Sequence, residues 1–228
     1  MKKTTFVALL LLSSQCFAEN LTESLQNIES EWASIYYSSP KQKQELDYDR
    51  LLDKTIHLSK QYPKNAEPII WQAIVKATNA DHQDAVSALK AIHEARDLLD
   101  KAIEINPQAM NGSAYVTLGT LYYMAPKWPL GFGDQVTAEK MLQTALKINP
   151  NGIDSNYFYG NFLLTNNRFN EAEKYFKRAL IIPARVEQLY ADNKLKEEAK
   201  LALKNTHEQK TDHSKGLFAS LFNSNSAK

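Results

Sequence analysis

Apolar positions recur at helical intervals along most of the chain, and three segments share one pattern. Each has an alanine, a large apolar residue four positions later, a second alanine three positions after that, and a terminating proline. The segments are 95–107, 138–150 and 172–183. Intervals of three and four place these residues on one helix face, and proline ends a helix because it lacks an amide hydrogen. The pattern predicts three amphipathic helices.

Two segments upstream have the pattern of partner helices for the second and third of these. YVTLGTLY covers residues 115–122 and NYFYGNFL covers 156–163, each with a glycine after a large side chain. Glycine lowers helix propensity, so we expect Gly119 and Gly160 where a closer contact with the next helix offsets that cost. The chain therefore predicts paired helices.

These pairs resemble the tetratricopeptide repeat (TPR) superfamily, with its Trp-x2-Leu-Gly-x2-Tyr pattern and later alanines and proline. The resemblance implies an all-α fold, a TPR-like α-solenoid of antiparallel helix pairs with a C-terminal capping helix. Each pair of a solenoid buries its apolar face only against its neighbours, and the end units need a polar outer side. A helical bundle without repeat geometry is the alternative.

The expected organisation has five parts. They are a signal peptide at 1–18, an N-terminal helix region at 19–45, about three and a half TPR-like pairs at 46–185, a capping helix at 186–206 and a flexible tail at 207–228. Leu189, Leu195, Ala199 and Leu203 of the capping helix are expected to face the array. For the tail, docking on a partner or on the array is the alternative to flexibility.

The repeats are unequal in length. The interval from Pro63 to Pro107 is 44 residues, that from Pro107 to Pro150 is 43, and that from Pro150 to Pro183 is 33. A plain TPR repeat has about 34 residues. In the first long unit the surplus lies at 79–95, where apolar residues keep helical spacing, so a longer helix pair is expected. In the second it lies in the sequence APKWPLGFGD, residues 125–134, where two prolines forbid a continuous helix.

The segment 125–134 is expected to be an ordered loop that ends at a helix cap. Gly131 and Gly133 permit positive φ, and Asp134 can accept hydrogen bonds from the free amides of the following helix. Trp128 and Phe132 are expected to close the edge of the array, because each would otherwise expose a large apolar surface. Contact with a ligand is the alternative for both side chains.

The first residues have the form of a secretory signal. Two lysines, an apolar run at 6–12 and small residues near a cut after Ala18 are typical of such a peptide, and the run is too short to span a bilayer. Lipid attachment at Cys16, which would add a membrane anchor, is the alternative. The expected location is the bacterial periplasm.

Composition argues against several classes of function. Of the 27 basic residues, Lys2 and Lys3 would be removed with the signal peptide. The remaining 25 basic residues are balanced by 26 acidic ones, so the net charge does not favour nucleic acid as a partner. Cys16 is the single cysteine, and the five histidines lack metal-ligand spacing. No catalytic motif is present, so we expect a protein that is not an enzyme and uses no metal or cofactor.

The binding surface is expected on the first helices of the pairs and on the long loop. Spacing carried over from the TPR superfamily selects Gln72, Lys76, Asn79, Thr120, Tyr123, Tyr157 and Asn161, to which the loop adds Trp128 and Phe132. Aromatic and amide groups suit an extended peptide or a small polar ligand. The leading hypothesis is a scaffold or adaptor that binds periplasmic or envelope proteins through its concave groove.

A second resemblance covers residues 114–203. The loop ending in Gly133-Asp134, the NP turn, the YFYG helix, Arg185 and Asp192 are similar to the T-component family of TRAP transporters and its small periplasmic relatives. This resemblance implies an accessory component that holds a small hydrophobic or carboxylate ligand and docks a substrate-binding protein. It is the alternative to the scaffold hypothesis.

Overall fold

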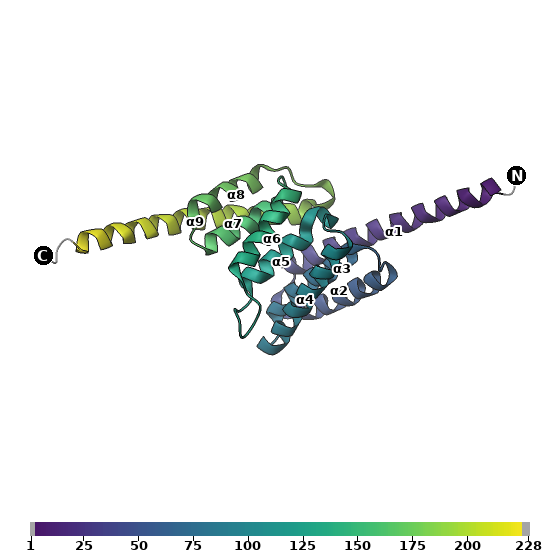
Figure 1. Cartoon of the computed structure of the whole chain (residues 1–228), viewed down its shortest axis with the longest axis horizontal. Helices are drawn as coiled ribbons and strands as arrows, with labels where there is room; N and C mark the ends of the chain where they lie inside the picture. Colours follow the sequence, from purple (N-terminus) through teal and green to yellow (C-terminus); the bar gives the residue numbers. More distant parts are fainter. Residues whose placement is uncertain (1–2, 225–228) are drawn as a thin grey trace. The chain divides into compact units, whose positions relative to one another are not determined.

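A computed structural model describes the backbone of residues 3–224 and the side chains of residues 21–209. In this range the chain is all-α, with helices joined by short turns and one longer loop and no β-strand. It divides into two compact units, Met1–Asn106 and Pro107–Lys228, and we describe each by itself (Figure 1). Among the described residues, no helix is both long and apolar enough to cross a membrane.

The first unit contains two helix pairs. Its elements are α1 (Lys3–Ser38), α2 (Lys41–Gln61), α3 (Ala66–Asn79), the short 3-10 helix η1 (Ala80–His82) and α4 (Ala85–Ile105). Helix α2 packs against α1 and α3, and α3 packs against α4. The expected boundary between residues 45 and 46 falls inside α2, which begins directly after Pro40. The longer helix expected in this repeat is present, since α4 has 21 residues.

The second unit contains two further pairs and a terminal helix. Its elements are η2 (Ala109–Gly112), α5 (Ser113–Met124), α6 (Gln135–Ile148), α7 (Ile153–Thr165), α8 (Phe169–Ile181), η3 (Val186–Gln188) and α9 (Leu189–Ser224). Helix α5 pairs with α6 and α7 pairs with α8. The α5–α6 loop extends beyond the ends of its two helices (Figure 1).

The repeated alanine pattern forms the core of both units. All nine residues of the pattern are fully buried: Ala95, Leu99, Ala102, Ala138, Leu142, Ala145, Ala172, Phe176 and Ala179. A Cβ on Gly119 would meet Leu142, and one on Gly160 would meet Phe176. The expectation that these glycines permit a close helix contact is confirmed, because hydrogen is the largest group that fits there.

Helix α9 covers the exposed side of the last pair. It packs against α8 and α7, and Leu195 and Ala199 are buried as expected. The expectation for Leu189 is wrong, since this side chain is 53% exposed at the first residue of the helix. The backbone of α9 continues to Ser224.

Two predictions concern residues whose side chains lie outside the described range. The signal peptide and Cys16 fall in residues 1–20, and most of the tail falls in residues 210–228. Cleavage after Ala18, lipid attachment and the behaviour of the tail therefore stay predictions.

Candidate functional site

The first helices of the second unit present one open face each, with matching positions. On α5 the positions are Ser113, Thr117, Thr120 and Met124, and on α7 they are Asp154, Phe158, Asn161 and Thr165. Successive intervals of four, three and four residues align each set along one helix face. All eight side chains are partly or fully exposed. We call these eight residues the open strip.

The hydroxyl groups of the open strip bond to their own helices. Thr117 Oγ1 donates to Ser113 O at 3.0 Å, and Thr120 Oγ1 donates to Val116 O at 2.9 Å. Thr165 Oγ1 donates to Phe162 O at 2.9 Å. Because the donated proton stays within the helix, each hydroxyl oxygen offers a lone pair to a bound molecule.

Two residues of α7 give the open strip its stronger binding groups. The ring of Phe158 packs edge-on against Tyr157, with 5.1 Å between the ring centroids, and stays partly exposed. Asn161 is partly exposed and has no hydrogen-bond partner among the described side chains. Its amide can therefore donate and accept at once, as recognition of a peptide backbone requires.

Charged groups lie near Asp154, at the first turn of α7. Arg185 bonds to Asp192, whose side chain is 1% exposed, with Nη2–Oδ1 at 2.6 Å. Burial disfavours the charge on Arg185, but its bonds to the Asp192 carboxylate and the negative charge of Asp154 more than offset it, so its pKa is raised. Arg185 thus stays a cation close to the strip.

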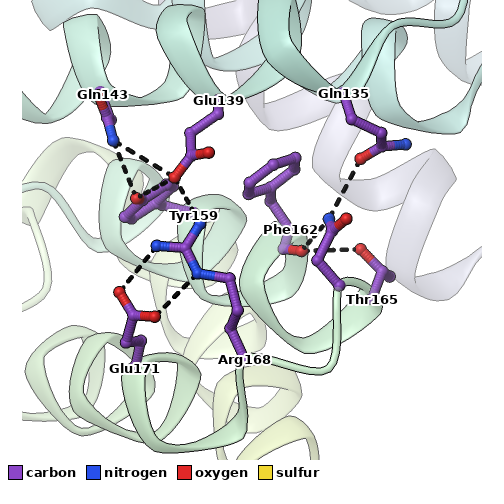
Figure 2. Close-up of polar contacts among 9 residues, drawn as sticks. Gln135, Glu139, Gln143, Tyr159, Phe162, Thr165, Arg168 and Glu171 are labelled. Atoms are coloured by element: carbon purple, nitrogen blue, oxygen red, sulfur yellow. Dashed lines mark hydrogen bonds and ion pairs between the residues drawn. The ribbon is translucent and has the colours of Figure 1, made fainter.

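A polar network holds the other side of α7 against α6 and the start of α8 (Figure 2). Tyr159 Oη donates to Glu139 Oε1 at 3.0 Å, and Arg168 Nη1 donates to the same oxygen at 2.5 Å. Arg168 also makes two bonds of 2.8 Å to Glu171. These pairings with Glu171 and Glu139 raise the pKa of Arg168. The network fixes the rotation of α7 and hence the direction of its open face.

The three residues predicted on α3 each bond to a neighbouring helix, and Asn79 is too buried to line an open groove. Gln72 accepts a bond of 3.1 Å from Ser59 of α2, and Lys76 pairs with Glu94 of α4 at 2.6 Å. Asn79 is 1% exposed and donates to Asp49 of α2 at 3.0 Å. Gln72 and Lys76 stay partly exposed, so their part in a binding surface stays a prediction.

On α5 and α7 the prediction found one open-strip residue in each helix. Thr120 and Asn161 are partly exposed members of the strip. Tyr123 instead packs against Phe162 of α7, with 5.9 Å between centroids, and Tyr157 is buried against Phe176. These two tyrosines stabilise helix packing. The matching spacing of 41 residues between the two helices was the available signal for the residues that were missed.

The loop does not close the edge of the array with Trp128, contrary to expectation. Trp128 is 85% exposed. Phe132 is partly buried and packs edge-on against Tyr122, with 5.2 Å between the ring centroids. The expected cap is confirmed, since Asp134 accepts from the amide of Thr137 at 2.6 Å. The freedom of the loop glycines to take positive φ is not used, because Gly112 is the glycine with positive φ among the described residues.

Close backbone approach explains both loop glycines. A Cβ on Gly133 would collide with the carbonyl oxygen of Ala125, and one on Gly131 would lie 2.5 Å from that of Pro126. The two sides of the loop thus pass too close together for any side chain. Glycine is required at both positions because a side chain would collide with the backbone, and not because the backbone needs a positive φ.

The first unit holds two features that sequence reasoning missed. A groove of about 580 Å³ between α1 and α2 has Ile28 and Leu58 in its lining, together with the ion pair of Lys54 and Glu31 at 2.6 Å. The ring of Trp32 of α1 stacks on that of Tyr36, and its centroid lies 5.9 Å from the ring centroid of Trp71 of α3. Neither follows a local motif, because each combines residues from separate helices.

Comparisons with known proteins support the fold. No family model and no curated protein matches the chain. It is similar to TTC0263, a thermophilic TPR protein of Thermus thermophilus, with a TM-score of 0.55 and 18% identity over 85% of this chain and 96% of that one. Two MamA structures give TM-scores of 0.43 and 0.42, at 18% and 17% identity over 78% and 85% of this chain and 99% and 96% of theirs. The chain therefore has a TPR-like α-solenoid fold.

Proposed function

We propose that this protein is a non-enzymatic scaffold that binds an extended segment of a partner protein along the open strip. The observation that carries the proposal is the repetition of the same exposed positions on α5 and α7, with the unengaged amide of Asn161 among them. Repeated first helices offer a partner equivalent contacts at regular intervals, as helical-repeat proteins do.

The chemistry of the open strip suits an extended peptide. Asn161 can pair with a peptide N–H and a peptide C=O, and Phe158 offers an apolar surface beside it. Arg185 and Asp154 supply charges of both signs near one end. A partner with an apolar residue flanked by charged ones matches this arrangement.

Export to the periplasm is part of the proposal. It rests on the two lysines, the apolar run and Ala18 at the start of the chain. N-terminal sequencing of the protein from its native host is expected to begin at Glu19. Recovery of the chain with residues 1–18 still attached would contradict export by this route.

A transporter accessory role is the second candidate. The observation in its favour is that Arg185 and Asp192, two residues of the second resemblance, form a partly buried pair near the open strip. Native mass spectrometry of the purified chain tests it. A co-purifying hydrophobic carboxylate lost in Asn161→Ala would favour this role over the scaffold.

Peptide selection tests the scaffold directly. Random peptides displayed on phage are selected against the full chain, and their affinity is measured by fluorescence anisotropy. Asn161→Ala is expected to weaken binding about tenfold, as loss of a buried pair of hydrogen bonds does. Asn170→Ala is the matched control, since Asn170 is exposed on α8. Equal binding by both variants, or no selected peptide at all, would contradict the proposal.

A further inference from the structure

The tip of the α5–α6 loop carries an exposed apolar cluster. Trp128 is 85% exposed and Leu130 is 72% exposed. The two prolines beside them, Pro126 and Pro129, are exposed as well. A folded protein seldom presents a tryptophan and a leucine to water at one projecting point without a function for them.

Backbone hydrogen bonds within the loop support the exposed position of the tip. The amide of Asp134 donates to Tyr122 O at 2.9 Å, and that of Gly133 donates to Pro126 O at 2.8 Å. At the tip, the amides of Leu130 and Gly131 both donate to Lys127 O, at 3.1 and 3.2 Å. These bonds, with Phe132 packed on Tyr122, hold the tip away from its own helices.

The only charge at the tip of the loop is positive. Residues 119–133 contain no aspartate or glutamate, and the exposed Lys127 lies next to Trp128. The first carboxylate, Asp134, is at the base of the loop, where it caps α6. The tip therefore offers apolar and aromatic groups with a cation, and no negative charge to repel an anionic surface.

We propose that this tip inserts into the surface of an anionic phospholipid bilayer. Tryptophan prefers the headgroup region, where its ring has both apolar and polar surroundings, and leucine reaches the acyl boundary. Lysine beside them attracts anionic lipids. A convex tip of this chemistry fits a fluid surface, which adapts to its shape, whereas a protein partner would need a preformed pocket of matching form.

This inference adds a second surface to the scaffold. The open strip binds a protein segment, and the loop tip places the scaffold at a membrane. The two functions use different residues, so each can be lost without the other.

Vesicle sedimentation of the full chain tests the inference. Vesicles of phosphatidylcholine with phosphatidylglycerol are compared with vesicles of phosphatidylcholine alone. Trp128→Ala is expected to reduce partition to the anionic vesicles about tenfold, because it removes the main buried apolar surface. Lys127→Gln is expected to reduce it about fivefold. The N-terminal apolar run is common to all variants, so it cannot cause these differences.

Val186→Ala is the matched control, since Val186 is 89% exposed and lies in η3. It is expected to partition like the unsubstituted chain. Brominated lipids provide a second measurement, in which fluorescence quenching disappears in Trp128→Phe while Trp32 and Trp71 are kept. Equal partition of Trp128→Ala and the unsubstituted chain, or equal binding to neutral vesicles, would overturn the inference. Absence of all vesicle binding would also overturn it.

Discussion

Arg185 makes two side-chain hydrogen bonds to the carboxylate of Asp192, from Nη2 to Oδ1 at 2.6 Å and from Nε to Oδ2 at 3.0 Å. The backbone amide of Arg185 adds a third bond of 2.7 Å to Oδ2. The pair connects the α8–α9 turn to the first turns of α9. It therefore fixes where the terminal helix starts to cover α7 and α8.

Loss of Arg185 is expected to destabilise the second unit. Arg185→Ala leaves the buried Asp192 carboxylate without its cation, which costs about 3 kcal/mol in comparable buried pairs. Urea unfolding monitored by circular dichroism measures the free energy of unfolding. Lys200→Ala, on the exposed side of α9, serves as the control and should change little. A cost below about 0.5 kcal/mol for Arg185→Ala, as for an ordinary surface substitution, would show that the pair does not secure α9.

Glu198 makes stability depend on pH. Burial raises its pKa above the ordinary 4.5, and a hydrogen bond from Tyr157 offsets part of that shift. A carboxyl with a raised folded-state pKa destabilises the fold progressively as pH rises from its unfolded value through its folded value. Glu198→Gln should therefore raise the melting temperature at pH 7 and leave it nearly unchanged near pH 4. A lower melting temperature at pH 7 would contradict this sign.

Gly160→Ala is expected to destabilise α7 despite the better helix propensity of alanine. The added Cβ would lie 2.7 and 2.9 Å from ring carbons of Phe176. Overpacking costs about 1–3 kcal/mol, against a propensity gain of about 1 kcal/mol. Calorimetry of Gly160→Ala, Phe176→Leu and the double variant measures the coupling. Additive effects would show that the two residues do not compete for this space.

Gly133→Ala is expected to open the loop without unfolding the helices. Its Cβ collides with the carbonyl oxygen of Ala125, so the bond from the Gly133 amide to Pro126 O cannot form as it does now. Hydrogen exchange should become faster at Gly131 and Asp134. Leu130→Ala removes an exposed side chain from the same loop and should leave exchange unchanged. Equal exchange in both variants would disprove the role assigned to Gly133.

Much of the fold could be predicted from the sequence, because the buried contacts repeat. Alanine, a large apolar residue and a second alanine at fixed intervals specify one helix face, and Gly119 and Gly160 specify the facing positions. The cap at Asp134 follows from local chemistry. Each of these signals depends on residues close together along the chain.

The exposed face of the first helices was less predictable, because it depends on helix rotation. An offset of one position turns a side chain by about 100°, and Asn79 is buried against α2 instead of lining an open groove. Trp128 was misplaced because the burial preference of tryptophan was applied to a loop whose hydrogen bonds hold it outward. Neither outcome is encoded in a short motif.

Site-specific cross-linking tests the open strip most directly. Cys16 is the single cysteine of the chain, so a cysteine introduced at residues 21–209 gives one defined attachment point once Cys16 is replaced by serine. A photoactivated cross-linker is attached at Thr120→Cys or Asn161→Cys, and at Asn170→Cys or Lys140→Cys as controls on α8 and α6. If the open strip binds a partner segment, both strip positions capture the same partner in its native host and neither control does. Capture from the control positions, with none from the strip, would contradict it.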